Sequence, residues 1–269
     1  MSIKFGMIGG GVMGEALLSR LLQRQIYSPD EVLVSEPQPE RQAFLVEKYG
    51  ISATADNRQA AIATEVLLLA IKPQVFTTVV SGLTGLASTP DRPLVLSILA
   101  GTPLSKLEAA FGGYPVVRAM PNTPATVGAG MTAIAAGSST ASHHLELAQR
   151  IFAAVGEVVE VPESLMDAVT GLSGSGPGYV ALVIEALADG GVAAGLPRAI
   201  AQKLAIQTVK GTAQLLQESN LHPGQLKDQV TSPGGTTIAG IAALERAGFR
   251  SALIEAVRAA YGRSQELGK

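Results

Sequence analysis

Two patterns of apolar and polar residues alternate along the first part of the chain. Short, nearly continuous apolar runs occupy residues 3–9, 32–36, 65–73, 93–101, 114–124, 130–137 and 156–163. Runs of this length that end at Pro or Gly are typical of strands buried on both faces of a parallel sheet. Glu15–Gln25 has helical spacing between the first two runs. Strands that alternate with helices predict a doubly wound α/β domain.

The pattern changes near residue 163, after which helical spacing dominates. Pro197–Ser219 and Phe249–Leu267 repeat apolar residues at helical intervals, and this part of the chain is rich in Ala and Gly with few large aromatic side chains. We therefore predict a doubly wound domain at 1–162 and an all-α domain at 163–269. Because its side chains offer modest volume for a core, the all-α domain is expected to complete its core against another subunit.

The composition excludes several classes of protein. Of the 269 residues, 47% are hydrophobic and 16% are charged, with a net charge of −2 and a pI of about 6.0. This favours a globular protein that binds neither nucleic acid nor a membrane surface. Cysteine is absent and there are three histidines, so we expect neither a disulfide scaffold nor a metal site. The start of the chain lacks the pattern of a signal peptide, and Tyr179–Ala194 is too short to span a membrane, which predicts a cytoplasmic protein.

The first predicted turn carries the glycine pattern G-x-G-x-x-G at Gly9–Gly14. It follows a strand, opens an apolar helix and precedes Glu36 by about 20 residues, which favours a dinucleotide-binding turn over a glycine turn without a ligand. Gly9 permits the tight turn, Gly11 lets a pyrophosphate approach the backbone, and Gly14 allows helix and strand to pack closely. The pattern predicts a Rossmann domain that binds NADPH or NADH.

The end of the second predicted strand bears on the choice between these two cofactors. A carboxylate at Glu36 would accept hydrogen bonds from a free ribose 2′-hydroxyl and repel a 2′-phosphate. Ser35 could instead bond a phosphate, and Arg41 follows a turn later, although a solvated helix charge explains Arg41 equally well. The sequence leaves the preference open.

Two further segments follow predicted strands, at the edge of the sheet where α/β proteins bind ligands. One is AIKPQ, with Lys72 before Pro73, and the other is RAMPNTP, with Asn122 between two prolines. Proline restricts the residue before it to extended conformations, so each segment is expected to be a fixed loop at that edge. An ordinary surface lysine and an asparagine turn are the alternatives.

A second candidate site lies at the entrance to a helix in the C-terminal part, in the segment SPGGTT. Gly234 and Gly235 leave backbone N–H groups uncovered, and the helix is expected to start near Ile238. Thr236 or Thr237 is expected to cap it. Free N–H groups and the helix dipole favour an anion there. The segment is either a plain N-cap or a cradle for a substrate carboxylate.

The segment GLSGSGPGYVALVI bears on the class of dehydrogenase. Its glycines, Gly171, Gly174 and Gly176, are similar to those of the β-hydroxyacid dehydrogenases, which place a catalytic lysine shortly after the last glycine. This chain has Val180 at that place, and Ile184 where those enzymes have Asn or Asp. The base that oxidises an alcohol is therefore missing, whereas reduction of an already protonated imine needs no such base.

Taken in order, five motifs resemble the pyrroline-5-carboxylate reductases over essentially the whole chain: IGGGVMGEAL, AIKP, RAMPNTPA, GLSGSGPGY and HPGQLKDQVTSPGGTTIAGIAALE. The resemblance implies reduction of 1-pyrroline-5-carboxylate to L-proline with hydride from NAD(P)H, the last step of proline biosynthesis. It implies a Rossmann domain and a helical domain that forms a homodimer, with higher assembly common in the family. Gly178 stands where the family usually has Ala, Val12 where it often has Asn, and Glu36 is less typical.

The resemblance also implies a set of site residues. Thr237 is expected to be catalytic, by positioning the ring nitrogen or a water beside it more than by acid catalysis. The substrate is expected at Ser232, Gly234, Gly235, Thr236 and Thr237. The cofactor is expected at Gly9, Gly11, Val12, Met13, Gly14, Ser35, Glu36, Asn57, Ala70, Ile71, Lys72, Pro73, Met120, Pro121 and Asn122. Because the two sets fall in different predicted domains, the site is expected at their junction.

Three other functions remain alternatives. The first is reduction of another cyclic imine carboxylate, such as a six-membered ring. The second is oxidation of a hydroxy acid, which Val180 argues against. The third is a regulator that senses NAD(P)H without chemistry. Such a sensor would not need the SPGGTT segment at a helix entrance, and no basic DNA-reading helix is evident.

Overall fold

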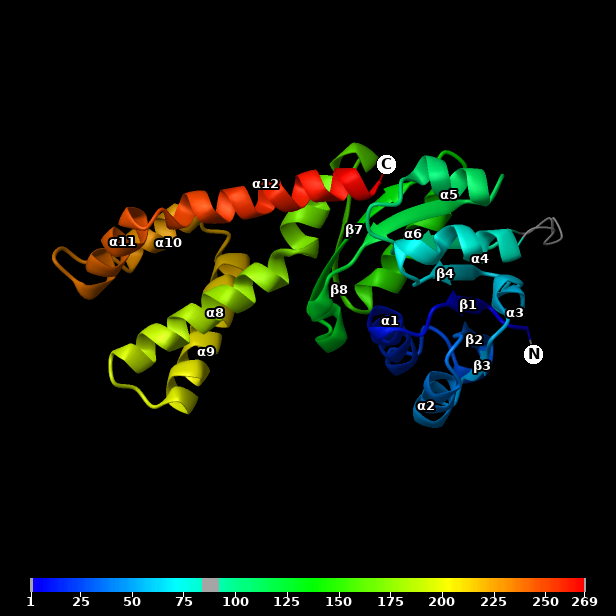
Figure 1. Cartoon of the computed structure of the whole chain (residues 1–269), viewed down its shortest axis with the longest axis horizontal. Coiled ribbons are helices and arrows are strands. Elements are labelled where there is room, and N and C mark those ends of the chain that lie inside the picture. Colours follow the sequence, from blue (N-terminus) through cyan, green and yellow to red (C-terminus); the bar gives the residue numbers. More distant parts are fainter. Residues whose placement is uncertain (1, 84–91, 269) are drawn as a thin grey trace. The chain divides into compact units, whose positions relative to one another are not determined.

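The structure, a computed structural model, describes residues 2–83 and 92–268. These residues form two compact units, drawn together in Figure 1. The sheet unit contains the described residues up to Ser175 and from Ala259 onward, and the helical unit is Gly176–Arg258. Among the described residues, no helix is long and apolar enough to cross a membrane. The division into domains at 1–162 and 163–269 stays a prediction.

The sheet unit is built on a sheet of eight strands within the described residues, in the order β3-β2-β1-β4-β5-β6-β7-β8. The strands are β1 (Phe5–Ile8), β2 (Val32–Ser35), β3 (Ser52–Thr54), β4 (Val66–Leu69), β5 (Leu94–Ser97), β6 (Val116–Met120), β7 (Gly130–Ala136) and β8 (Gly156–Glu160). Neighbouring strands are parallel except β6 and β7. The order reverses at β1, which lies between β2 and β4, so the predicted doubly wound domain is confirmed.

Helices cover both faces of this sheet. They are α1 (Val12–Gln23), α2 (Pro39–Tyr49), α3 (Asn57–Ala61), α4 (Phe76–Gly82), α5 (Leu104–Ala110), α6 (Ser142–Ala153) and α7 (Met166–Val169). Leu17 of α1 and Phe152 of α6 belong to the core on one face. Ala60 of α3 and Leu107 of α5 belong to the core on the other face. Because both faces are covered, the central strands β1 and β4 are apolar throughout.

Two details differ from the sequence-based expectation. β3 was not expected, because its three residues Ser52–Thr54 carry no large apolar side chain and pair with β2 alone, at the edge of the sheet. Helix α1 begins at Val12 rather than at Glu15, since Gly11 is already its N-cap. The glycine turn therefore passes directly into the helix.

The helical unit is confirmed as all-α. Its helices are α8 (Gly176–Ala193), α9 (Arg198–Ser219), α10 (Pro223–Gln229), α11 (Thr236–Arg246) and the first part of α12 (Phe249–Leu267). Helices α8 and α9 lie side by side (Figure 1) and pack through the buried residues Ala188, Ala201 and Ala205. Larger apolar side chains on the same two helices, such as Leu182 at 66% and Leu204 at 52%, are exposed. The chain alone therefore gives this unit a small core.

Candidate active site

The glycine turn between β1 and α1 has the geometry of an anion site. Gly9 has a positive φ of 103°, and a Cβ there would come within 2.5 Å of the Ala70 carbonyl oxygen. A Cβ at Gly14 would come within 2.6 Å of the Gly9 carbonyl oxygen, whereas one at Gly11 would meet no described atom within 4 Å. Gly11, the N-cap, has no side chain with which to cover the first N–H groups of α1. The turn thus fits the pyrophosphate of a dinucleotide, with its backbone approachable at Gly11.

The fold brings the other predicted cofactor residues to the same edge of the sheet. β1, β2, β4, β5 and β6 are parallel, so their carboxyl ends share that edge. Ser35 and Glu36 end β2, Ala70–Pro73 follows β4, and Met120–Asn122 ends β6. Asn57 begins α3, and its Oδ1 accepts a hydrogen bond of 2.7 Å from the Ser35 hydroxyl, which is buried. The Ser35 hydroxyl therefore faces Asn57.

Exposure differs among the remaining members of this set. Val12 is 72% exposed at the start of α1, whereas Met13 packs against the core beneath it. Lys72 is exposed and precedes a short 3-10 helix that begins at Pro73. The apolar side chain of Val12 therefore offers a bound cofactor contact area but no side-chain hydrogen bond.

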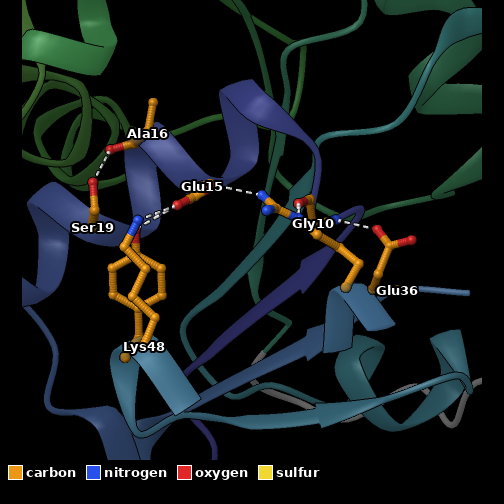
Figure 2. Close-up of polar contacts among 8 residues, drawn as sticks. Gly10, Glu15, Ala16, Ser19, Glu36 and Lys48 are labelled. Atoms are coloured by element: carbon orange, nitrogen blue, oxygen red, sulfur yellow. Dashed lines mark hydrogen bonds and ion pairs between the residues drawn. The ribbon is translucent and has the colours of Figure 1, made fainter. Parts of the chain in front are cut away.

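A polar network holds the turn from the side of α2 (Figure 2). The Gly10 N–H donates to Oε2 of Glu36 at 2.8 Å, and Nε of Arg41 donates to the Gly10 carbonyl oxygen at 2.7 Å. Nη2 of Arg41 also contacts Oε2 of Glu15 at 2.5 Å. Sequence analysis did not identify Glu15, because it lies on α1 and its partner lies on α2, 26 residues away.

Glu15 is the centre of this network. Besides Arg41, it accepts hydrogen bonds from Nζ of Lys48 at 2.9 Å and from the hydroxyl of Tyr49 at 2.7 Å. Burial would raise the pKa of Glu15, but these donors outweigh burial and lower it from 4.5 to about 2. Glu15 is therefore ionised at neutral pH, and it fixes α2 against the start of α1.

The second candidate site, SPGGTT, is a turn that leads into α11. Gly234 has a positive φ of 66°, and the Gly235 N–H donates to the Ser232 carbonyl oxygen at 3.1 Å. With proline at the second position and a left-handed glycine at the third, the segment has the features of a type II turn. Such a turn fixes the backbone directly before the helix.

The expectation that a threonine caps this helix was wrong. Helix α11 begins at Thr236, not near Ile238, and Gly235 is its N-cap with φ −75° and ψ 173°. Thr236 and Thr237 are therefore its first two helical residues. Glycine has no side chain with which to cap, so the N–H groups of the first turn remain directed at whatever lies beyond the helix end. A plain threonine N-cap is excluded, and the arrangement suits a carboxylate.

The glycine-rich segment before α8 belongs to the sheet unit. Thr170–Gly174 form a π-helical turn, a feature that is frequent at functional sites. A Cβ at Gly174 would come within 2.7 Å of Cε of Met120, so glycine lets this turn pack against the end of β6. In the part of the chain that the structure describes, no group of three or more His, Asp or Glu side chains is placed to hold a metal ion.

Comparisons with known protein families cover both parts of the chain. Residues 163–267 match the family model for pyrroline-5-carboxylate reductase dimerisation. Residues 4–101 match the model described as NADP oxidoreductase, coenzyme F420-dependent. A pyrroline-5-carboxylate reductase of Synechocystis is 63% identical over the full length of both chains, and that of Escherichia coli is 40% identical, also over the full length of both.

Solved structures agree with these matches. The pyrroline-5-carboxylate reductase of Coxiella burnetii is 36% identical, covers the whole of both chains and superposes with a TM-score of 0.91. The Plasmodium falciparum enzyme, solved with NADP bound, is 32% identical with a TM-score of 0.88, and the match covers 99% of this chain and 98% of that one. With full-length relatives at this level of identity, the chain belongs to the pyrroline-5-carboxylate reductase family.

Proposed function

We propose that this protein reduces 1-pyrroline-5-carboxylate to L-proline with NADPH or NADH, the last step of proline biosynthesis. The observation that carries the proposal is the entrance to α11, where a fixed turn precedes first-turn N–H groups that no cap residue covers. Anions bind well at such an entrance, and the substrate carries a carboxylate next to its ring imine. A cytoplasmic location stays a prediction.

The substrate residues divide into backbone and side-chain roles. The backbone around Gly235 and Thr236 is proposed to hold the carboxylate through the uncovered N–H groups of the first turn of α11, with Ser232 and Gly234 shaping the turn. Thr237 is half-buried, and its hydroxyl is proposed to hydrogen-bond the ring nitrogen or a water beside it. Holding the ring in this way lowers the barrier by orientation, without a general base.

The cofactor residues are proposed to act from the sheet unit. The start of α1 and Gly11 would hold the pyrophosphate, and Glu36 would lie at the adenine ribose. Ala70–Pro73 and Met120–Asn122 are proposed to lie against the nicotinamide, because they lie at the carboxyl ends of β4 and β6, at the same edge of the sheet on either side of β5. When bound, the reduced nicotinamide supplies the hydride that is added to the imine carbon of the ring, which becomes C5 of proline.

The protein forms a homodimer through its helical region. Residues 163–267 match the dimerisation model, and α8 and α9 have a small core between them but expose large apolar side chains such as Leu182, Leu187 and Ile200. Exposed apolar area of this kind is typical of a surface that another chain covers. Higher assembly, common in the family, stays a proposal.

A direct assay tests the activity. The purified protein would be given 1-pyrroline-5-carboxylate or its six-membered analogue, with loss of reduced-cofactor absorbance and the amount of cyclic amino acid both measured. We expect proline to form in a one-to-one ratio with oxidised cofactor, and faster than the six-membered product. Faster turnover of the larger ring would make the protein a reductase of another cyclic imine. Cofactor binding without turnover of either ring would favour a regulator.

A further inference from the structure

The carboxylate of Glu36 is fixed at the place where Rossmann domains hold the ribose of the cofactor. Its Oε2 accepts a hydrogen bond from the Gly10 N–H at 2.8 Å, and its Oε1 accepts one from the Gln38 N–H at 3.2 Å. The residue is 8% exposed. Two backbone donors thus hold the Glu36 carboxylate beside the glycine turn, as Figure 2 shows for Gly10. A phosphate on the 2′-oxygen of the ribose would meet this negative charge.

The arginine next to this carboxylate is already paired. The side chain of Arg41, on α2, links Gly10 and Glu15. Its Nε is used by the Gly10 carbonyl oxygen and its Nη2 by Glu15, at 2.7 and 2.5 Å. An arginine that recognises a 2′-phosphate offers its planar fork to the phosphate oxygens. In this protein, two of the guanidinium nitrogens of Arg41 already donate hydrogen bonds to Gly10 and Glu15.

The third polar group at this place, Ser35, is also engaged. Its hydroxyl donates to Oδ1 of Asn57 at 2.7 Å and is buried at 1% exposure. Glu15, in turn, would stay ionised when Arg41 moved, because Lys48 and Tyr49 also donate to it. If Arg41 turned to a 2′-phosphate, it would exchange its ion pair with Glu15 for one with the phosphate. The net gain in binding free energy for NADPH would therefore be small.

We infer that Glu36 selects NADH over NADPH in this protein, and that Glu15 supports this selection by holding Arg41 at the glycine turn; the inference rests on the proposed function. Glu36 acts directly, by accepting hydrogen bonds from the free ribose hydroxyls and repelling a 2′-phosphate. Glu15 is a positioning residue that acts through Arg41. The selectivity of the enzyme is thus set by two carboxylates from separate parts of the fold, one directly after β2 and the other on α1.

The test compares kcat/KM for NADH and NADPH, with saturating 1-pyrroline-5-carboxylate, in the full-length protein and its variants. The unmodified protein is expected to favour NADH by about tenfold or more, since a 2′-phosphate beside the Glu36 carboxylate is an unpaired like-charge contact. Glu36→Gln should lower that preference by about tenfold, through KM for NADPH. Glu15→Gln should lower it by a smaller factor, because Arg41 becomes free to turn to the phosphate. Glu47→Gln, which removes an exposed charge on the same helix α2, should leave the ratio unchanged.

Arg41→Met separates the role of Glu15 from a structural one. In the otherwise unmodified protein, Arg41→Met should weaken both cofactors equally, because Arg41 holds the turn and does not reach the phosphate. When Arg41→Met is added to Glu15→Gln, the increase in kcat/KM for NADPH that Glu15→Gln produces should disappear. If Glu15→Gln lowers activity with both cofactors equally, or if Arg41→Met alone impairs NADPH selectively, the role assigned to Glu15 is wrong.

Binding of NAD⁺ and NADP⁺ by titration calorimetry gives a second readout that does not depend on turnover. A preference for NADP⁺ in the unmodified protein, or an unchanged ratio of dissociation constants in Glu36→Gln, would overturn the inference. A preference for NAD⁺ that Glu36→Gln removes, without turnover of any imine, would uphold the cofactor assignment and refute the proposed function. The two failures are therefore distinguishable.

Discussion

The side-chain amide of Asn122 donates a hydrogen bond of 3.0 Å to the carbonyl oxygen of Ser173, 51 residues later in the chain. Its Oδ1 accepts a second bond, of 2.9 Å, from the Met131 N–H. Asn122 therefore joins the end of β6 to β7 and to the π-helical turn Thr170–Gly174. Because Asn122 is also a proposed cofactor residue, we expect its side chain to fix the loop and its backbone to face the nicotinamide.

Replacing Asn122 should loosen this loop. Asn122→Asp keeps the acceptor for Met131 but places a carboxylate oxygen against the carbonyl of Ser173, so we expect a loss of about 1–3 kcal/mol in the free energy of unfolding. The KM for the cofactor should rise as well. Urea unfolding followed by circular dichroism and steady-state kinetics would measure the two effects. A variant of normal stability and normal KM would contradict the role given to the side chain.

Arg118 should be important for stability rather than for activity. It is buried in β6, and its guanidinium contacts Glu163 at 3.2 Å and Asp167 at 3.8 Å. Asp167 also accepts a hydrogen bond from Ser264 of α12 at 2.7 Å. Arg118→Met would leave two partly buried carboxylates without their cation, at a cost of about 3 kcal/mol.

The matched control for Arg118 is an arginine in an exposed pair. Arg258 contacts Glu255 one turn away on α12, and both side chains are largely exposed. Arg258→Met should therefore leave the urea midpoint nearly unchanged. If the urea midpoint fell equally in Arg118→Met and Arg258→Met, the buried ion pairs of Arg118 would not contribute more to stability than an exposed pair does.

Thr237→Ala should impair use of the imine while leaving the cofactor largely unaffected. One lost hydrogen bond to the ring nitrogen or its water corresponds to roughly a tenfold lower kcat/KM for the imine. Thr236→Ala should have a smaller effect, since only the backbone of Thr236 is assigned to the substrate. Steady-state kinetics with the imine concentration varied would measure use of the imine in each variant, and calorimetric Kd values would measure binding of the cofactor. Normal kinetics in Thr237→Ala would remove Thr237 from the mechanism.

The turn before α11 should tolerate asparagine but not valine at position 234. Gly234 has a φ of 66°, a region that costs most side chains about 1–2 kcal/mol and β-branched ones more. Gly234→Asn is expected to keep most of the affinity for the imine, whereas Gly234→Val should shift the turn and raise its KM. Both variants would be compared by KM and by thermal unfolding. An equal KM in the two would show that the turn does not position the substrate.

Glu15 makes stability depend on acid pH. The pKa of its carboxyl falls from 4.5 to about 2 on folding, so its contribution to stability is complete above about pH 4.5 and is lost as the pH falls through about 2. Glu15→Gln should therefore lower the melting temperature most at neutral pH. The difference in melting temperature between the variant and the unmodified protein should become smaller as the pH is lowered. A gap that stayed constant from pH 7 to about pH 2 would contradict this coupling.

The sequence predicted the sheet well because burial on both faces leaves a clear signature. The run at 65–73 is apolar from Val66 to Ile71, the run at 93–101 has Ser97 as its one polar residue, and they became β4 and β5. β3 gave no such signal, because an edge strand of Ser, Ala and Thr resembles a loop. Long-range polar contacts were also out of reach: Glu15 and Arg41 meet only because β1 and β2 are neighbours in the sheet and carry α1 and α2 with them.

The start of α11 was missed for a different reason. Thr236 and Thr237 are good N-cap residues by type, so the sequence favoured them. The backbone of Gly235 instead adopts the extended N-cap conformation. Because glycine is compatible with many backbone conformations, its presence in the sequence does not predict which one it adopts. The anion site was therefore predicted in the right segment, with the wrong residue as its cap.

The most direct test of the proposed chemistry follows the hydride itself. The protein would be supplied with reduced cofactor that carries deuterium at C4 of the nicotinamide, on either face, and with unlabelled 1-pyrroline-5-carboxylate. The account predicts L-proline with one deuterium at C5, from one of the two labelled cofactors only. Proline without deuterium from either cofactor, or oxidation of cofactor without formation of proline, would contradict it.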